Sequence, residues 1–480
     1  MYSFLISVVL LILGYIFYGA LVDRIFEPDD RKTPAVEIND GVDYVPMPTW
    51  KVFLIQLLNI AGTGPIFGAL SGAIFGPIVY LWIVFGCIFG GAVHDYMTGM
   101  LSARNKGASI SEIDGMYLGN SVLAVLRACT VILLVMCGVV FTVGPAGLLA
   151  LITPENLTTN FWLVVVMIYY FIATFVPIDK VIGKVYPIFG ACLVIMAFGV
   201  SGSLLFSGNF TMPEVWDQFA NMHCKGISVF PFMFITVACG AISGFHGTQS
   251  PMMARCITSE RLGRKVFYGA MIAEGLIALV WAAGGVSVYE SSQALLEAGG
   301  GCSAVVYHIC TTTMGKVGAI LAMLGVIACP ISSGDTAYRS ARLTLADWFK
   351  IDQANWKKRL ALTAPILVIG GLIGLCDYSI VWRYFSWTNQ TLAMIALWAA
   401  SIYLCDNKKN FWITLIPACF MSVVTMTYFF AAPECLGFIW KNFTNYSVEK
   451  TETFAICFGF IFMFIFLYRF IEHMRKKLNS

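Results

Sequence analysis

The stretch Asn59-Ile-Ala-Gly-Thr-Gly-Pro-Ile-Phe-Gly-Ala-Leu70 places a Gly-Thr-Gly-Pro sequence inside a run of apolar residues. Glycine weakens a helix, and proline removes a backbone donor and clashes with the preceding turn. A long apolar segment with such a centre predicts a discontinuous helix whose break has a function. The rest of the sequence indicates what the break serves.

The composition indicates an integral membrane protein. The 480 residues are 59% hydrophobic and only 12% charged, and the mean hydropathy is +0.79. A soluble chain carries about 25% charged residues. The net charge of +3 is too small to indicate a nucleic-acid partner, so the lipid bilayer is the expected surrounding.

About thirteen apolar runs are long enough to cross a bilayer. They cover 2–22, 52–70, 74–98, 121–150, 159–177, 185–207, 229–258, 266–289, 313–336, 360–376, 381–403, 411–431 and 453–472. The first run has no basic residues before it. We therefore interpret it as a retained transmembrane helix and not as a cleaved signal peptide.

Positive charge predicts the orientation of these spans. If the N-terminus lies outside, the inside loops carry 24 of the 30 Lys and Arg residues, and the outside loops carry three. Cytoplasmic loops are enriched in Lys and Arg. The sequence therefore predicts an outside N-terminus, an inside C-terminus and an odd number of spans.

A second break lies five spans after the first, in Gly240-Ala-Ile-Ser-Gly-Phe-His-Gly-Thr-Gln-Ser-Pro251. Five spans reverse the direction of the chain, and transporters with inverted repeats place two discontinuous helices in this way. Pro65 and Pro251 would each open a half-helix, with Ser250 as an N-cap. The free N–H groups would then favour a carboxylate. The alternative is two glycine packing clusters with ordinary proline kinks.

These features predict an all-α polytopic membrane protein with LeuT-like inverted five-helix repeats. Residues 1–50 would form a leading helix and a cytoplasmic loop, and residues 51–403 the ten-helix core. The core divides into repeats at 51–207 and 229–403. Residues 404–480 would form two trailing helices and a basic cytoplasmic tail.

The two breaks and their polar neighbours are the expected substrate site. The candidates are Gln56, Asn59, Gly62, Thr63, Gly64, Gly244, His246, Gly247, Thr248, Gln249, Ser250 and Asn389. An imidazole at position 246 could bind a carboxylate or titrate near neutral pH. The alternative is that it satisfies unwound backbone carbonyls.

A coupling ion needs oxygen ligands or a titratable acid. Ser332, Ser333, Asp335 and Thr336 form a dense oxygen cluster at the predicted end of the eighth core helix, and Glu274 is an acid within a span. Alternatively, Asp335 caps a cytoplasmic helix and Glu274 forms a structural salt bridge. A proton is the expected ion, with sodium as an alternative.

His94, Asp95 and Arg383 are candidate gating residues at the predicted ends of their spans, although the aromatic residues around Arg383 also fit an interfacial belt. The cysteines show no metal-ligand spacing, so we expect no metal site. Cys302 and Cys310 could pair if their loop faces an oxidising space. No HExxH, P-loop or GxSxG motif in strand context occurs, so we expect neither an enzyme nor a cofactor.

Four segments together resemble the carbon starvation protein A family over roughly residues 30–400. They are TPAVEINDGVDYVPMPTWKVFLIQLLNIAGTGPIFGAL, LWIVFGCIFGGAVHDYMTGMLSARNKGASISE, YGAMIAEGLIALVWAAGG and WRYFSWTNQTLAMIALW. The chain is shorter than better-known members, lacks their His-His-Phe run before the first break, and has His94-Asp95 where they often have Gln-Asp. The resemblance implies a bacterial inner-membrane protein linked to peptide or pyruvate uptake.

The expected function is secondary active import of a small carboxylate, with pyruvate as the leading candidate, by proton symport during carbon starvation. A di- or oligopeptide carrier is the main alternative. A nutrient receptor without translocation is a second class, and a passive channel is a third. Two opposed broken helices fit alternating access better than a channel.

Overall fold

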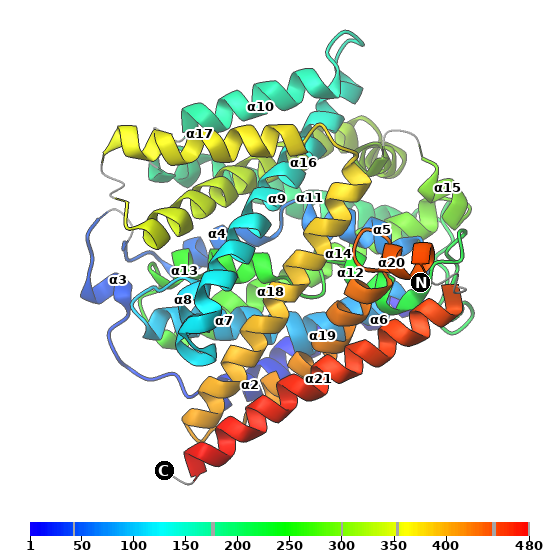
Figure 1. The fold of residues 1–480 in the computed structure, drawn as a ribbon. Helices are drawn as coiled ribbons and strands as arrows, with labels where there is room; N and C mark the ends of the chain where they lie inside the picture. The colour runs from blue at the N-terminus through cyan, green and yellow to red at the C-terminus, as the bar shows by residue number, and fades with distance from the viewer. Residues whose placement is uncertain (42–43, 174–177, 299–300, 352–354, 444–447, 479–480) are drawn as a thin grey trace.

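The computed structural model describes residues 1–480 except 42–43, 174–177, 299–300, 352–354, 444–447 and 479–480. All regular elements in this described part are helices, as Figure 1 shows, which confirms the all-α prediction. Short 3-10 and π-helical segments are labelled η. The elements are α1 (Tyr2–Leu13), η1 (Gly14–Tyr18), α2 (Gly19–Phe26), α3 (Pro34–Glu37), α4 (Thr49–Ile60), α5 (Gly64–Ala73), α6 (Val79–Phe85), η2 (Gly86–Gly91), α7 (Ala92–Arg104), α8 (Ile110–Leu118), α9 (Asn120–Ile152), α10 (Thr159–Ala173), α11 (Ile178–Phe206), η3 (Val229–Met233), α12 (Phe234–Thr236), α13 (Gly244–Ala254), η4 (Glu260–Leu262), η5 (Arg264–Tyr268), α14 (Gly269–Val288), α15 (Ser292–Leu296), α16 (Gly301–Phe349), α17 (Trp356–Ile373), α18 (Tyr378–Asp406), α19 (Trp412–Ala431), α20 (Gly437–Phe443) and α21 (Val448–Leu478).

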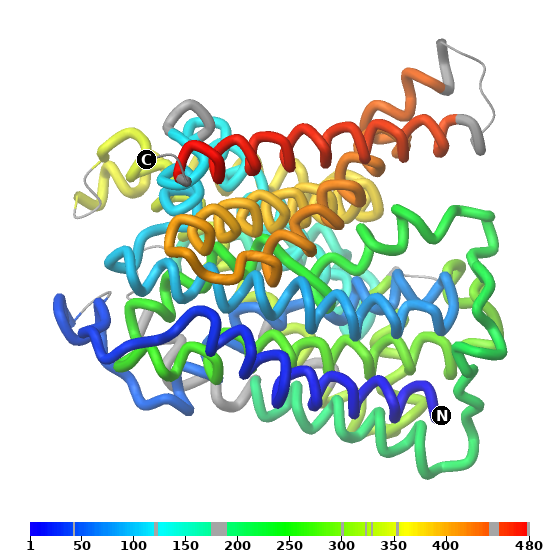
Figure 2. The backbone as a smooth tube through the Cα atoms, turned by 90° about the horizontal axis from the view of Figure 1, so that it is seen from below, coloured from blue at the N-terminus to red at the C-terminus, as the bar shows by residue number. Residues whose placement is uncertain are grey.

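Seven helical stretches among the described residues are long and apolar enough to cross a membrane, or eight if the bent pair α4–α5 forms one span. The predicted number of about thirteen spans therefore stays a prediction. Figure 2 shows the long helices lying side by side, with α21 along one edge of the bundle and α1 toward the opposite side.

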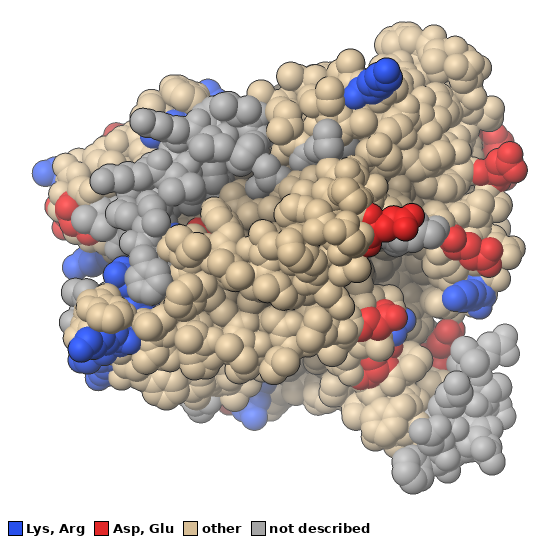
Figure 3. All heavy atoms as spheres, turned by 90° about the horizontal axis from the view of Figure 1, so that it is seen from above, with Lys and Arg blue, Asp and Glu red and all other residues tan. Residues whose placement is uncertain are grey.

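The charged side chains gather at the two ends of the bundle. On the face drawn in Figure 3, Lys and Arg lie mainly at one end, Asp and Glu lie mainly at the other, and a band with few charged side chains separates them. A belt with few charges between charged ends suits a protein that spans a bilayer. The predicted orientation agrees with this distribution but stays a prediction.

The two broken helices cross each other in the middle of the bundle. α4 packs against α13, and α5 packs against α12, so the first half of each broken helix meets the second half of the other. α14 packs along both α4 and α5. Antiparallel crossing of this kind is what inverted repeats predict. The proposed limits of the two repeats stay a prediction.

The second break differs from the predicted one. The backbone unwinds from Val237 to Ser243, and α13 begins at Gly244 with Ser243 at the N-cap position. Pro251 lies inside α13, and the Ser250 hydroxyl donates to the His246 carbonyl 3.0 Å away. The prediction that Ser250 caps a half-helix opened by Pro251 is therefore wrong.

The eighth core helix is also longer than predicted. α16 continues to Phe349, so Ser332–Thr336 lies within the helix and not at its end. Gly315 within it is non-helical, with φ 58° and ψ −139°. Cys302 and Cys310 lie on α16, both as free thiols. Eight residues of helix separate them by about 12 Å, so the suggested pair does not form.

Candidate functional site

The first break lies where the sequence places it. α4 ends at Ile60, α5 begins at Gly64 with Pro65 in its first turn, and the two helices are bent by 47°. Gly64 also lies directly against the second break. A Cβ atom at Gly64 would lie 2.4 Å from Cys239 Sγ, so the two breaks meet at a point where only glycine fits.

Side chains from α18 hold the second break open. Asn389 Oδ1 accepts hydrogen bonds from the Phe245 amide at 2.6 Å and from the Ser243 hydroxyl at 3.1 Å, and Asn389 Nδ2 donates to the Ala238 carbonyl at 2.8 Å. Gln390 Nε2 donates to the Phe234 carbonyl at 2.7 Å. These bonds satisfy backbone groups that have no helical partner. The sequence suggested Asn389 as a substrate ligand. Its side-chain amide instead binds the backbone of the second break, and both its oxygen and its nitrogen already have hydrogen-bond partners.

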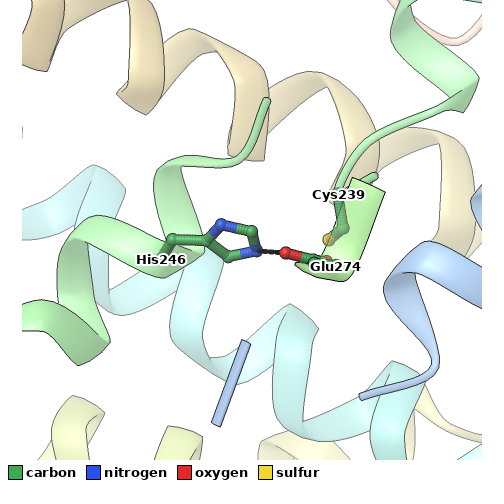
Figure 4. Close-up of side chains that lie close together, drawn as sticks. All are labelled: Cys239, His246 and Glu274. Atoms are coloured by element: carbon green, nitrogen blue, oxygen red, sulfur yellow. Dashed lines mark ion pairs between the residues drawn. The ribbon is translucent and has the colours of Figure 1, made fainter. Parts of the chain in front are cut away.

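A chain of three buried titratable side chains lies beside this break. Asp95 of α7 places Oδ2 2.9 Å from His246 Nδ1 of α13, and His246 Nε2 lies 3.2 Å from Glu274 Oε2 of α14. Figure 4 shows the second contact. All three side chains are fully buried. One imidazole thus bridges two carboxylates on separate helices.

The two contacts of His246 differ in kind. The Asp95 contact meets the geometry of a hydrogen bond, whereas neither Glu274 oxygen has a hydrogen-bond partner among the described residues. If Nδ1 carries the proton shared with Asp95, the Nε2 lone pair faces a carboxylate. A proton added on this side relieves the repulsion. The arrangement can therefore take up and release a proton in an apolar region.

His94 completes the cluster from α7. Its Nδ1 lies 2.8 Å from Asp95 Oδ1, so Asp95 has an imidazole on each oxygen. Both residues lie near the start of α7 and are buried, which corrects the prediction that they sit at the end of their span. A gating role for His94 and Asp95 stays a proposal.

Cys239, His246 and Glu274 offer donor atoms within 4.8 Å of one another. Thiolate, imidazole and carboxylate are donors that transition metals accept. However, the Cys239 sulfur already lies 3.5 Å from the Ser243 hydroxyl and 3.7 Å from Asn389 Nδ2. Because the sulfur already contacts the Ser243 hydroxyl and the Asn389 amide, we treat the cluster as a proton site and assign no metal to it.

Several predicted substrate ligands are buried polar groups on α4, in the first break and on α13, which packs against α4. Gln56 is fully buried with both amide atoms unpaired among the described residues, and the Thr63 hydroxyl and Gln249 Oε1 are also unpaired. Buried polar atoms are normally satisfied. These three residues are therefore the best-placed candidates to meet a polar ligand between the two breaks.

Other predicted substrate residues have structural contacts. The Thr248 hydroxyl donates to the Phe245 carbonyl at 2.6 Å and accepts from Gln249 Nε2 at 2.9 Å. Asn59 is buried near the end of α4. The glycines contribute close packing. A Cβ at Gly244 would lie 2.4 Å from the Asn389 carbonyl oxygen, and those at Gly62 and Gly247 would press on Phe141 and His94.

The predicted coupling cluster on α16 separates into two environments. The Ser333 hydroxyl donates to the Leu58 carbonyl of α4 at 3.3 Å, and the Thr336 hydroxyl donates to the Ser333 carbonyl at 2.8 Å. Asp335 pairs with Arg339 at 2.9 Å, one turn along the same helix. Ser332 is half-buried. Because Arg339 already compensates the Asp335 charge, Glu274 is the better candidate for a coupling group.

The end of the bundle that carries Met1 contains a cavity of about 390 Å³ between α5, α12 and α18. Arg383 lines its mouth and forms an ion pair with Glu434 at 3.2 Å. Thr236 and Ser386 also line it. Thr236 directly precedes the second break, and Ser386 lies about one turn before Asn389. The cavity therefore leads toward the junction of the two breaks.

The opposite end of the bundle is tied together by Arg104 at the end of α7. Its guanidinium donates to Glu260 Oε2 of η4 at 2.9 Å, to the Tyr403 hydroxyl of α18 at 2.5 Å and to the Glu27 carbonyl after α2 at 2.9 Å. Glu260 is buried. One side chain thus joins three elements where the chain is predicted to face the cytoplasm.

Sequence reasoning missed the contacts that cross between helices. It weighed His246, Asp95 and Glu274 separately, it suggested Gln390 only as a residue that could line the cavity, and it passed over Cys239 and the Arg104–Glu260 pair. The four-residue spacing of Tyr378, Trp382 and Ser386 was an available signal, because it places three polar-tipped residues on one face of a helix.

A family model described as carbon starvation protein CstA matches residues 1–148, 146–292 and 282–428. The chain belongs to the carbon starvation protein CstA family. An uncharacterized membrane protein of Haemophilus influenzae is 42% identical over 352 residues, which cover 62% of this chain and 95% of the relative. The resemblance seen in the sequence is thereby confirmed.

Two further relatives in the family carry functional names. The pyruvate/proton symporter BtsT of Escherichia coli is 22% identical over 90% of this chain and 82% of its own length. The peptide transporter CstA of Campylobacter jejuni is 28% identical over 58% of this chain and 49% of its own length. The matched region thus spans about half of the Campylobacter relative.

Solved structures show the same fold. The manganese transporter of Eremococcus coleocola superposes with a TM-score of 0.56 at 13% identity, covering 92% of this chain and 99% of that chain. MhsT in complex with L-phenylalanine gives a TM-score of 0.55 at 14% identity, with 87% and 97% covered. The chain is therefore a multi-pass protein of the bacterial inner membrane with the fold of LeuT-like transporters.

Proposed function

We propose that the chain is a secondary active transporter that imports a small carboxylate, with pyruvate as the leading substrate, by proton symport. The observation that carries this proposal is the buried Asp95–His246–Glu274 chain beside the junction of the two breaks. Ionisable groups inside membrane segments are costly and mark ion or proton pathways.

The substrate would bind where the breaks meet. Gln56 and Gln249 offer unpaired buried amide atoms there, and Thr63 offers a hydroxyl just before α5. The first turn of α5 has free backbone N–H groups at the positive end of the helix dipole. At α13, by contrast, the Phe245 amide is bound to Asn389. The α5 end is therefore the better place for a carboxylate.

Coupling follows from charge. A carboxylate beside Glu274 and Asp95 brings a third negative charge into a region of low polarity, which is unfavourable. A proton on the Glu274 side of His246 removes one of these charges. Proton and substrate therefore favour each other's binding, as thermodynamic linkage requires.

Alternating access would proceed by movement of helices around this fixed site. The cavity between α5, α12 and α18 supplies access from the end that carries Met1, and the Arg104–Glu260–Tyr403 contacts close the opposite end. These contacts would have to separate for substrate release into the cytoplasm.

The second candidate is a peptide carrier, which the name of the Campylobacter jejuni relative favours. A receptor that does not translocate its ligand has no need for a buried proton site, so this site disfavours the receptor hypothesis. Uptake of labelled pyruvate into proteoliposomes separates these functions. An inward proton gradient should drive accumulation, dipeptides should not compete, and a sodium gradient should have no effect. Accumulation that ignores the pH gradient would reject proton symport.

A further inference from the structure

The cavity at the Met1 end has apolar walls. Leu70 of α5 and Ile74 directly after α5 line one side, and Phe232 and Ile235 line another. A volume of about 390 Å³ falls within the range of small-ligand pockets. Such walls bind the apolar part of a solute, but apolar contacts do not orient its polar groups.

Three residues of α18 that carry hydrogen-bond donors line this cavity. Tyr378, Trp382 and Ser386 follow one another at four-residue spacing, so they lie on one face of the helix, and all three line the cavity. Tyr378 Oη, Trp382 Nε1 and Ser386 Oγ have no hydrogen-bond partner among the described residues. Trp382 is 5% exposed and Ser386 is 0% exposed. Buried donors of this kind favour a ligand that carries acceptors.

The charge of the lining favours an anion. Lys225 and Arg383 line the mouth, and none of the described residues that line the cavity is Asp or Glu. Burial and the charge of Lys225 lower the pKa of His223, which also lines the mouth, so its imidazole is neutral near pH 7. Glu434 pairs with Arg383 but does not line the cavity.

We propose that this cavity is an outer binding site that selects monocarboxylates without an ammonium group, such as 2-oxo acids, over amino acids and zwitterionic peptides. The carboxylate accepts from the α18 donors, and the short apolar tail lies against α5 and α12. The inference rests on the proposed function, and it adds the class of solute that reaches the breaks. It favours pyruvate over peptides as the transported class.

The selection has a physical basis, because none of the described residues that line the cavity offers a carboxylate to an ammonium group. Alanine and pyruvate have the same number of carbon atoms and the same carboxylate, but alanine carries an ammonium group. In this cavity the ammonium would lose water, would face Lys225 and Arg383, and would find no carboxylate to pair with. Dialanine is larger, and burial of its ammonium group in this cavity is unfavourable for the same reason.

The test is equilibrium binding of labelled pyruvate to the full-length protein in lipid nanodiscs. Pyruvate and longer 2-oxo acids should compete at similar concentrations, whereas L-alanine and dialanine should need at least about tenfold more. Trp382→Phe keeps an aromatic ring but removes the indole N–H, and it should raise the Kd for pyruvate about five- to tenfold. Trp387→Phe is the matched control, because Trp387 Nε1 already donates to the Thr425 carbonyl.

Two results would overturn the outer site: competition by L-alanine as strong as by pyruvate, or the same Kd for W382F and the wild type. If either occurs while a pH gradient still drives pyruvate uptake, the outer site fails and proton symport stands. If binding is selective and W382F weakens it but no gradient drives uptake, the outer site stands and the proposed symport fails.

Discussion

His246 Nδ1 lies 2.9 Å from Asp95 Oδ2, although 151 positions separate the two residues in the chain. The contact joins α7 to α13 at the second break, and the other ring nitrogen of His246 faces Glu274 of α14. Three helices of the core therefore share one buried titratable unit. Any movement that separates these helices changes the environment of its proton.

Glu274→Gln should uncouple transport from the proton gradient without abolishing substrate binding. The variant cannot take up a proton at position 274, yet it keeps the size and polarity of the side chain. Exchange of labelled for unlabelled pyruvate across proteoliposomes should continue, while gradient-driven accumulation falls at least about tenfold. The control is Glu297→Gln, which changes an exposed acid on the loop after α15. Normal accumulation by E274Q would remove Glu274 from the coupling site.

Gly64→Ala should destabilise the junction of the two breaks. The added Cβ would lie 2.4 Å from Cys239 Sγ and 2.6 Å from Cys239 Cβ, so the breaks must move apart. Overpacking of this kind costs about 1–3 kcal/mol. Thermal unfolding of the purified protein measures the effect. Gly202→Ala on α11 is the control, because a Cβ there meets nothing within 4 Å. Equal unfolding temperatures for both variants would contradict this packing.

Asp335→Asn should reduce stability more than it changes coupling. Asp335 and Arg339 are nearly buried partners at 2.9 Å, and breaking a buried ion pair by removing one partner costs about 3–5 kcal/mol. The double variant Asp335→Asn, Arg339→Gln should recover most of that loss. Thermal unfolding and gradient-driven uptake of the single and double variants test this. A stable double variant that has lost proton coupling would return Asp335 to the coupling role.

The attachment of the N-terminus should depend on pH through Glu214, which lies in the loop before η3. Burial raises the pKa of Glu214, but the Met1 ammonium at 2.7 Å and Ser3 lower it more, to about 2. A lowered pKa contributes stability above the ordinary value of 4.5, and this contribution is lost as the pH falls from 4.5 toward 2. The difference in unfolding temperature between wild type and Glu214→Gln should therefore shrink below pH 4.5. A difference that is constant across this range would contradict the ion pair.

The sequence next to the first break predicted its position. The position of the second break depends on contacts with residues far away in the sequence. Pro65 opens α5 because proline favours the first turn of a helix, and the sequence around it shows this directly. The same rule misplaced the second break at Pro251, because Asn389 and Gln390 bind the backbone before Gly244 and fix the unwound segment there. Neither residue is near the break in sequence.

The candidate site could be predicted only in part for the same reason. His246, Glu274 and Asp95 each stood out as a polar residue in an apolar span, but no spacing links three residues on α13, α14 and α7. The Ser332–Thr336 oxygen cluster on α16 was predicted to be a coupling-ion site because its members are neighbours in sequence. In the folded chain, Arg339 pairs with Asp335, and Ser333 turns to the Leu58 carbonyl of α4.

The most direct test of the account is proton movement that accompanies the substrate. Proteoliposomes with equal pH on both sides and a pH-sensitive dye inside are given an inward pyruvate gradient, under conditions that clamp the membrane potential. The account predicts that the lumen acidifies with wild-type protein and does not acidify with E274Q, which still exchanges pyruvate. Pyruvate influx by the wild type without acidification would contradict proton symport through the Asp95–His246–Glu274 chain.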